Sequence, residues 1–343
     1  MLGYILKRVL LMIPTLIGAL TVTFVVIQFV PGGPIEQALT RGRIGPSGNA
    51  AYRARGDSDA KQIEQLKKLY GFDKPVHVRY VEMLSDFARF ELGTSFSHNR
   101  PVWDLIRDKL PVSISLGLWT FLASYLISLP LGITKAVREG SAFDLATTLA
   151  VLVGYAIPAF VLGVLLIVLF AGGTFLDLFP LRGLVSENWA ELSWPARIAD
   201  YFWHLALPLT CLVIGSFATM TFLTKNTFIE EMRKQYVLVA RAKGVSQQRV
   251  LWKHIFRNAL IPIVTGFPAA FIGAFFTGAL LIETLFSLDG LGLLGYESII
   301  RRDYPVVLGS LYLFTLIGLL VKLISDVMYT LVDPRVQFAA VGR

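Results

Sequence analysis

Long runs without a charged residue alternate with polar segments along this 343-residue chain. Because a helix rises about 1.5 Å per residue, about 20 apolar residues cross the roughly 30 Å hydrocarbon core of a bilayer. Six runs are long enough, and only the last carries charge, near its end: residues 9–30, 112–134, 145–170, 205–223, 261–282 and 306–331. The pattern predicts an all-α polytopic membrane protein with six transmembrane helices.

The first run predicts an uncleaved membrane anchor. It follows Lys7 and Arg8, as the apolar core of a secretory signal would, but such cores have about 7 to 15 residues before a small-residue cleavage site. This run is longer and leads into the sequence PGGP at residues 31–34.

Between the first two runs, the pattern predicts a flexible loop followed by two short helices. The loop is the Gly-, Ser- and Arg-rich stretch TRGRIGPSGNAAYRARGDSD, residues 40–59. The helices have apolar residues at helical spacing and should end near Gly71 and Gly93. These apolar positions are Ile63, Leu66 and Leu69 in the first helix, and Tyr80, Leu84 and Phe87 in the second.

Composition agrees with a membrane class. The chain is 55% hydrophobic and 16% charged, whereas an ordinary soluble domain is roughly 25% charged. The net charge of +8 does not by itself indicate a nucleic-acid partner, because in a membrane protein the position of the charges matters more than their sum. The single cysteine, Cys211, excludes an internal disulfide and is expected to be a small buried hydrophobic residue.

Positive charge predicts the orientation of the spans. The segments 1–8, 135–144, 225–258 and 333–343 carry 14 Lys and Arg residues, and the short loops on the other side carry four. Short loops rich in Lys and Arg face the cytoplasm, so both termini should be cytoplasmic. We therefore expect three parts. Residues 1–110 form the first transmembrane helix and a long outer region, 111–332 form a five-helix core with an inner loop at 225–260, and 333–343 form a cytoplasmic tail.

The sequence offers little catalytic chemistry. The four histidines are scattered, and His254 with Asn258 makes a poor metal site. GLGLLG, residues 290–295, matches a dinucleotide-binding pattern but lacks the preceding strand, so we expect a tight turn there. The chain has no phosphate-binding P-loop sequence. We predict neither an enzyme nor a bound cofactor or metal.

Charges that could couple transport to an ion gradient are also nearly missing from the runs. Glu283 ends the fifth run, and Lys322 and Asp326 are placed to pair near the inner end of the sixth. If the protein transports a solute, the energy should come from another subunit.

The inner loop 225–260 predicts two amphipathic helices joined at Gly244. Gly244 fits the left-handed position that ends a helix, and Ser246 fits the N-cap of the second. Apolar residues recur at helical spacing in both. They are Phe228, Met232, Tyr236 and Val239 in the first helix, and Leu251, Ile255 and Ala259 in the second, widened by Trp252 and Phe256.

Such a helix pair could lie on anionic lipid or dock into a groove on a cytoplasmic partner. The small residues Ala240, Ala242 and Gly244 favour the partner, because they allow close approach of another backbone. The charges would then mainly fix topology.

The stretch YVLVARAKGVSQQRVLWKHIFRNALIP, residues 236–262, resembles the cytoplasmic coupling loop of ABC importer permeases of the dipeptide and oligopeptide family. Further matches are PGGP, GFDKPV, ELGTSF, RPVWDLI, REGSAFD, LIETLFSLDGLGLLG, RRDYPVVLG and LVDPR. Two departures exist: a Glu of the broader family is replaced by Leu238, and the subfamily sequence PGDP reads PGGP. Any role of those two acids does not transfer.

The resemblance implies a type I ABC importer permease fold in the bacterial inner membrane. It implies a second homologous permease subunit as heterodimer partner, two cytoplasmic ABC ATPase subunits and a periplasmic substrate-binding protein, with membrane lipid around the spans. The loop would be the element that couples to the ATPase. The coupling residues it implies are Tyr236, Ala240, Arg241, Ala242, Lys243, Gly244, Leu251, His254 and Asn258.

The expected function is a transmembrane permease subunit that forms the translocation path for oligopeptides or peptide-like solutes. Nickel, glutathione and modified peptides stay open as cargo, and the residues of the path are not identified. The alternative is a stand-alone channel or secondary carrier that uses the loop for lipid contact. An intramembrane hydrolase is disfavoured, because serines such as Ser216 have no basic partner in the spans.

Overall fold

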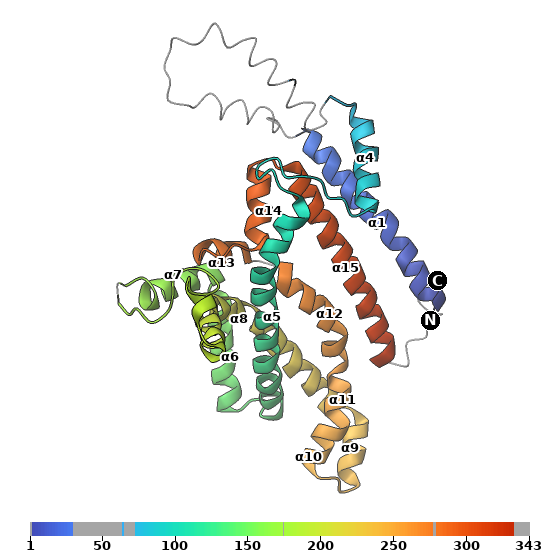
Figure 1. The fold of residues 1–343 in the computed structure, drawn as a ribbon. Coiled ribbons are helices and arrows are strands. Elements are labelled where there is room, and N and C mark those ends of the chain that lie inside the picture. The colour runs from blue at the N-terminus through green and yellow to red at the C-terminus, as the bar shows by residue number, and fades with distance from the viewer. Residues whose placement is uncertain (1, 30–63, 65–72, 174, 277–278, 333–343) are drawn as a thin grey trace. The chain divides into compact units, whose positions relative to one another are not determined.

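The computed structural model describes residues 2–29, 64, 73–173, 175–276 and 279–332. The regular secondary structure of these residues is helical (Figure 1). The only pairing of extended backbone among them is an isolated bridge between Thr94 and Pro101. The elements are α1 Leu2–Phe29, α4 Val76–Ala88, α5 Val102–Val137, α6 Ala142–Ala156, α7 Ala159–Phe170, η1 Trp189–Glu191, α8 Trp194–Met232, α9 Gln235–Ala242, α10 Gln247–Arg249, the π-helix η2 Val250–Ile255, α11 Phe256–Ala259, α12 Ile261–Phe276, α13 Ala279–Leu285, α14 Leu291–Ile300 and α15 Tyr304–Val332.

Four of these helices, α1, α5, α8 and α15, are long and apolar enough to cross a membrane, and two bent pairs raise the number to six if each pair is one span. One pair is α6 with α7, bent by 92°, and the other joins residues 247–259 to residues 261–273 at 48°. The all-α polytopic fold predicted from the sequence is confirmed.

The predicted run 145–170 is not one straight helix, because the chain turns at Pro158. Ile157 adopts an extended conformation, with φ −84° and ψ 118°, and ends α6. The ring of a proline disfavours helical backbone in the residue before it, so a new helix, α7, starts after Pro158.

The described residues form two compact units, which we treat separately. The smaller unit comprises residues 5–108 and 294–319 and is built around the buried side chain of Asp303. The hydroxyl of Ser95 donates to this carboxylate at 2.5 Å, and the backbone N–H groups of Phe96 and Ser97 donate to it at 3.0 Å. These bonds connect the sequences ELGTSF and RRDYPVVLG.

In the same unit, α4 matches the second predicted outer helix. Phe87 is buried and packs against the ring of Tyr312 at 5.1 Å, while the hydroxyl of Tyr80 lies 2.6 Å from that of Thr21 on α1. The helix ends at Ala88, before Gly93, because Phe90 already has a positive φ of 62°. The first predicted outer helix and the loop 40–59 lie outside the described residues.

The larger unit contains most of α5 and the helices α6 to α13. Its apolar core joins α5, α7, α8 and α13 through Leu116, Leu162, Cys211 and Phe286. The expectation for Cys211 is confirmed, since the thiol is free and fully buried in this core. At Gly132 on α5, an added Cβ would stand 2.6 Å from Cβ of Thr224, so glycine lets α5 and α8 approach closely.

The prediction of a tight turn at GLGLLG is wrong, because α14 already starts at Leu291. The first glycines of this sequence instead pack against a buried carboxylate, that of Glu283 on α13. Glu283 is 1% exposed, and its Oε2 accepts the backbone N–H of Leu293 at 2.7 Å, near the start of α14. A carboxylate at this end of a helix is stabilised by the N-terminal partial positive charge. A Cβ at Gly290 would meet Oε1 of Glu283 at 2.4 Å, and one at Gly292 would meet Oε2 at 3.1 Å.

Replacement of Gly290 by alanine is therefore expected to destabilise the fold by about 1–3 kcal/mol, since a buried carboxylate cannot swing away into solvent. Gly295 on the same helix is the matched control, because an added Cβ there meets nothing within 4 Å. Thermal unfolding of the purified protein should show a lower midpoint for Gly290→Ala and an unchanged or higher one for Gly295→Ala. Equal midpoints for the two variants would refute the proposed steric contact.

Candidate functional site

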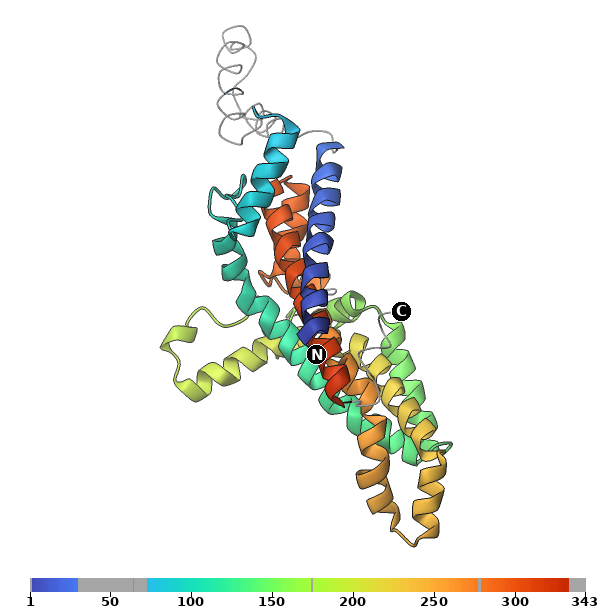
Figure 2. The same ribbon diagram turned by 90° about the vertical axis from the view of Figure 1, so that its right-hand side faces the viewer.

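The segment 225–260 forms a helical hairpin with Gly244 at its tip. Figures 1 and 2 show α9 beside the helix that runs from α10 to α11. Gly244 has φ +76°, which confirms the predicted left-handed conformation. Its N–H donates to the carbonyl of Arg241 at 2.9 Å, and the N–H of Val245 donates to the carbonyl of Ala240 at 3.2 Å. This pair of bonds is the Schellman arrangement that closes a helix C-terminus.

The prediction of one continuous helix from Phe228 to Gly244 is wrong. The helix α8 ends at Met232, and α9 starts at Gln235 after a break. The break shifts the helical phase, so Val237 is fully buried while Val239, placed in the apolar stripe by the sequence, is 52% exposed.

The second helix also departs from simple α-helical spacing. Residues Val250–Ile255 form a π-helix, whose wider turn buries both Val250 and Ile255 at 1% exposure. Ile255 and Ala259 are buried as predicted, but Trp252 is 56% exposed. Ser246 occupies the predicted N-cap position without a capping bond from its side chain.

The inward face of the hairpin packs against the ends of α5 and α8. A core of buried residues forms there, with Leu251, Tyr236 and Ala240 partly buried against it. Its members are Ile133, Ala136, Phe228, Val237, Val250, Ile255 and Ala259. Burial of these side chains fixes the hairpin to the membrane helices through the hydrophobic effect.

Three of the predicted coupling residues meet at the hydroxyl of Tyr236. This hydroxyl lies 2.8 Å from Oε1 of Glu231 and 3.4 Å from the backbone carbonyl oxygen of His254, and the side chain of Asn258 also bonds to it. Burial raises the pKa of Tyr236 to about 12, so the hydroxyl stays protonated at physiological pH. Tyr236 thus ties α9 to both neighbouring helices.

The outward face carries apolar side chains that are not members of the hairpin core. Leu238 is 59% exposed, Val239 is 52% exposed and Trp252 is 56% exposed. The predicted residues from Arg241 to Gly244 are exposed as well. We call the side chains of Leu238, Val239 and Trp252 the exposed apolar patch. Exposed apolar side chains on a hairpin whose other face is buried are candidates for a protein-binding surface.

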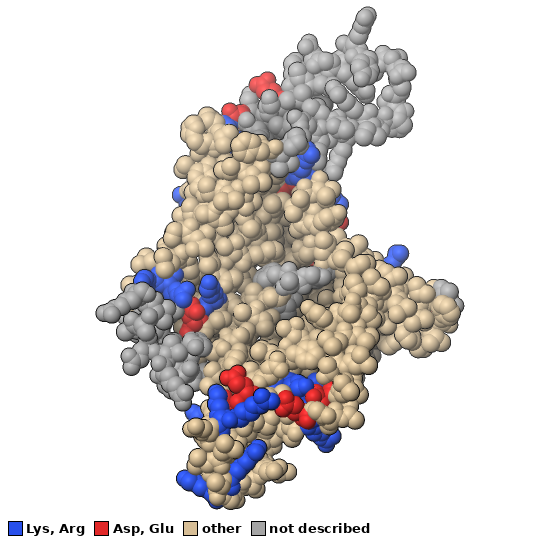
Figure 3. Space-filling view, turned by 180° about the vertical axis from the view of Figure 1, so that it is seen from behind, with Lys and Arg blue, Asp and Glu red and all other residues tan. Residues whose placement is uncertain are grey.

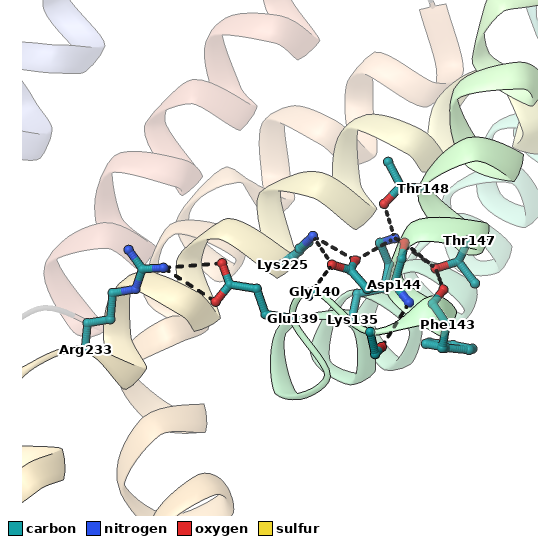
Figure 4. Close-up of polar contacts among 10 residues, drawn as sticks. Lys135, Glu139, Gly140, Phe143, Asp144, Thr147, Thr148, Lys225 and Arg233 are labelled. Atoms are coloured by element: carbon teal, nitrogen blue, oxygen red, sulfur yellow. Dashed lines mark hydrogen bonds and ion pairs between the residues drawn. The ribbon is translucent and has the colours of Figure 1, made fainter.

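A buried ionic cluster lies beside this hairpin, where α5, α6 and α8 meet (Figure 4). Both carboxylate oxygens of Asp144 accept from Nζ of Lys225, at 2.7 and 2.8 Å. Nζ of Lys135, whose side chain is fully buried, lies 3.1 Å from Oδ1 of Asp144 and also donates to its backbone carbonyl at 2.9 Å. Nζ of Lys135 also donates hydrogen bonds to the hydroxyl oxygens of Thr147 and Thr148.

Position in the sequence did not reveal this cluster, because its members come from separate segments. In the sequence, Lys135 and Lys225 belong to the Lys- and Arg-rich segments that indicate the orientation of the spans, and Asp144 is the last residue of REGSAFD. The one local signal was a charged residue at each end of a short inner loop. A second, exposed pair joins Arg233, just after α8, to Glu139 at 3.3 Å. In Figure 3, charged residues gather at the lower end of the view, the end that α9 and α10 occupy in Figure 1.

Comparison with known proteins agrees with these features. Residues 128–338 match the family described as binding-protein-dependent transport system inner membrane component. The chain is 53% identical to the "Peptidoglycan transport system permease protein YejB" of Agrobacterium fabrum over 98% of both chains. It is 51% identical to the "Inner membrane ABC transporter permease protein YejB" of Escherichia coli O157:H7, covering 98% of this chain and 99% of that one.

More distant relatives carry names from peptide transport. The chain is 32% identical to the "Oligopeptide transport system permease protein AppB" of Bacillus subtilis, covering 98% of this chain and 100% of that one. The resemblance inferred from the motifs, to dipeptide and oligopeptide permeases and within them to YejB, is confirmed.

Proposed function

This chain belongs to the family of binding-protein-dependent transport system inner membrane components, and on that premise we propose that it is the membrane permease subunit of an ATP-driven importer. It forms part of the translocation path for oligopeptides or peptide-like solutes. The names of the relatives support this substrate class, and a peptidoglycan fragment would fall within it because such fragments carry peptides.

The observation that carries the proposal is the exposed apolar patch on a hairpin anchored to α5 and α8. The chain has no P-loop sequence, so it cannot bind ATP phosphates by the P-loop mechanism on its own, and a partner subunit would supply that chemistry. The hairpin offers such a partner apolar side chains and small residues around Gly244, while its inward face is buried against the membrane helices. Nucleotide-driven movement of the partner would then move the helices as a rigid body.

The remaining assembly follows from the same family. We propose that a second homologous permease completes the path and that two cytoplasmic ATPase subunits drive it. A periplasmic binding protein delivers the substrate, and both termini of this chain lie in the cytoplasm. The residues of the hairpin act as the coupling element, with Tyr236, His254 and Asn258 holding its two helices together.

Replacement of Gly244 by valine tests the coupling role. An L residue in the left-handed conformation is disfavoured by about 1–2 kcal/mol, and a branched side chain disfavours it further. The variant should still reach the membrane, since a Cβ at Gly244 meets nothing within 4 Å. ATP-dependent uptake of a labelled peptide by cells should fall about tenfold, the factor expected from a change of this size in the population of the native turn.

Gly244→Asn is the matched control, because asparagine tolerates the left-handed region and should keep most of the uptake. Normal uptake by Gly244→Val would count strongly against the coupling role. A stand-alone carrier makes a different prediction, since its uptake would persist after ATP depletion and the protein would purify without any ATPase.

A further inference from the structure

A recess of about 300 Å³ opens between α5, α8 and α12 in the larger unit. It lies at the middle of two apolar runs, yet hydroxyl groups line it. These come from Thr120, Ser124 and Tyr125 on α5 and from Ser216 and Thr219 on α8. Ser216 and Thr219 are exposed, so the recess is reached from the surface of the subunit, whereas Thr120 and Ser124 form its buried wall.

Two of these hydroxyls have no hydrogen-bond partner among the described residues. They are Oγ1 of Thr120, in a side chain that is 7% exposed, and the phenolic oxygen of Tyr125. A buried polar group without a partner is costly, and most such groups find one. Neighbouring hydroxyls do find partners: Ser128 donates to the carbonyl of Phe217 at 2.9 Å, and the hydroxyls of Ser124 and Ser216 lie 2.8 Å apart.

The surface of the recess differs from the surfaces of α6 and α7. The large exposed side chains on those helices are aliphatic over most of their length, as lipid contact requires. Examples are Leu145, Leu149, Leu152, Val161, Val164 and Leu165. Five hydroxyls facing acyl chains would gain no hydrogen bonds, so lipid is a poor occupant for the recess.

We propose that the recess is a substrate-binding site for the main chain of a peptide, whose amide groups bond to Thr120 and Tyr125. The inference rests on the proposed function as a peptide permease. Peptide amides are neutral donors and acceptors, as are the hydroxyls, and no charged residue lines the recess. Phe121 supplies an apolar wall for side chains of varied kind. A site of this chemistry holds the feature that all peptides share and does not select their side chains.

Protection of an introduced thiol tests occupancy directly. We would label the Thr219→Cys variant, an exposed position in the recess, with N-ethylmaleimide in nanodiscs containing the complete transporter, with and without a large excess of trialanine. Trialanine should slow labelling several-fold, and the same excess of glucose should not. The parent protein gives the background from buried Cys211, and Thr210→Cys, an exposed position on α8 outside the recess, should be labelled without protection.

Labelling that is unaffected by trialanine, or slowed equally by glucose, would overturn the proposal. ATP-dependent peptide uptake by the parent transporter is measured in parallel. Absence of that uptake would refute the proposed function itself, whereas uptake without protection would refute only this site.

A second measurement separates a substrate contact from a structural role. Removing an unpartnered hydroxyl with Thr120→Val or Tyr125→Phe should leave the thermal midpoint unchanged or raise it, yet increase KM for peptide uptake about fivefold per lost hydrogen bond. Ser128→Ala, which removes a partnered buried hydroxyl, should lower the midpoint and leave KM unchanged. A lower midpoint with unchanged KM in Thr120→Val and Tyr125→Phe would show that these hydroxyls serve the fold alone.

Discussion

Replacement of Asp144 by alanine is expected to cost about 3–5 kcal/mol of stability, because it leaves two lysines beside a buried site without their counter-charge. Lys135 is fully buried and Lys225 has a side chain that is 16% exposed, so water can hydrate neither ammonium fully. The loss should appear as a large drop in thermal midpoint and in the amount of protein recovered from membranes. Asp144→Asn should be less severe, since it keeps the shape and one acceptor oxygen.

The exposed pair of Glu139 and Arg233 is the matched control, because it lies near the same loop. Its side chains are 48% and 72% exposed, and exposed pairs contribute about 0–1 kcal/mol. Glu139→Ala should therefore change the midpoint little. If Asp144→Ala behaved like Glu139→Ala, the ionic cluster would not be a structural anchor of α5, α6 and α8.

Replacement of Leu238 by aspartate is expected to abolish the association with the ATPase while sparing the fold. Leu238 is 59% exposed, so a charge there costs the isolated chain little. A charge buried in an apolar contact with a partner costs about 2 kcal/mol or more, which is about thirtyfold in affinity. Co-purification of the ATPase subunits and peptide-stimulated ATP hydrolysis should both be lost.

Val81→Asp provides the control for that variant, as Val81 is a 63% exposed apolar residue on α4, in the smaller unit. It should keep the ATPase association. Retention of the ATPase by Leu238→Asp would exclude the exposed apolar patch as the docking surface.

Apolar runs in the sequence were sufficient to predict the membrane helices, because burial in lipid requires long apolar segments whatever the tertiary structure. They could not predict the 92° bend between α6 and α7. Hydropathy carries no information on the direction of the helix axis. A proline such as Pro158 within an apolar run is compatible both with a continuous membrane helix and with a bend. The sequence around Gly244 was sufficient to predict the left-handed turn there, because such a turn depends on one residue and its neighbours.

Other features depended on contacts between distant segments. The break after Met232 and the π-helix at Val250 place Val237 and Val250 in the core, and simple helical spacing put other residues there. The partners of Asp144 come from positions 135 and 225, so only the folded chain brings them together. The same holds for Glu283, whose carboxylate is enclosed by Gly290 and Gly292 at the start of α14.

Site-specific cross-linking tests the docking of the hairpin on an ATPase most directly. A photo-reactive benzoylphenylalanine at position 238, introduced into the complete transporter in membranes, should form a cross-link to an ATPase subunit on illumination, whereas the same group at position 81 should not. A cross-link from position 238 only to lipid, with the complex shown to be intact, would contradict the account.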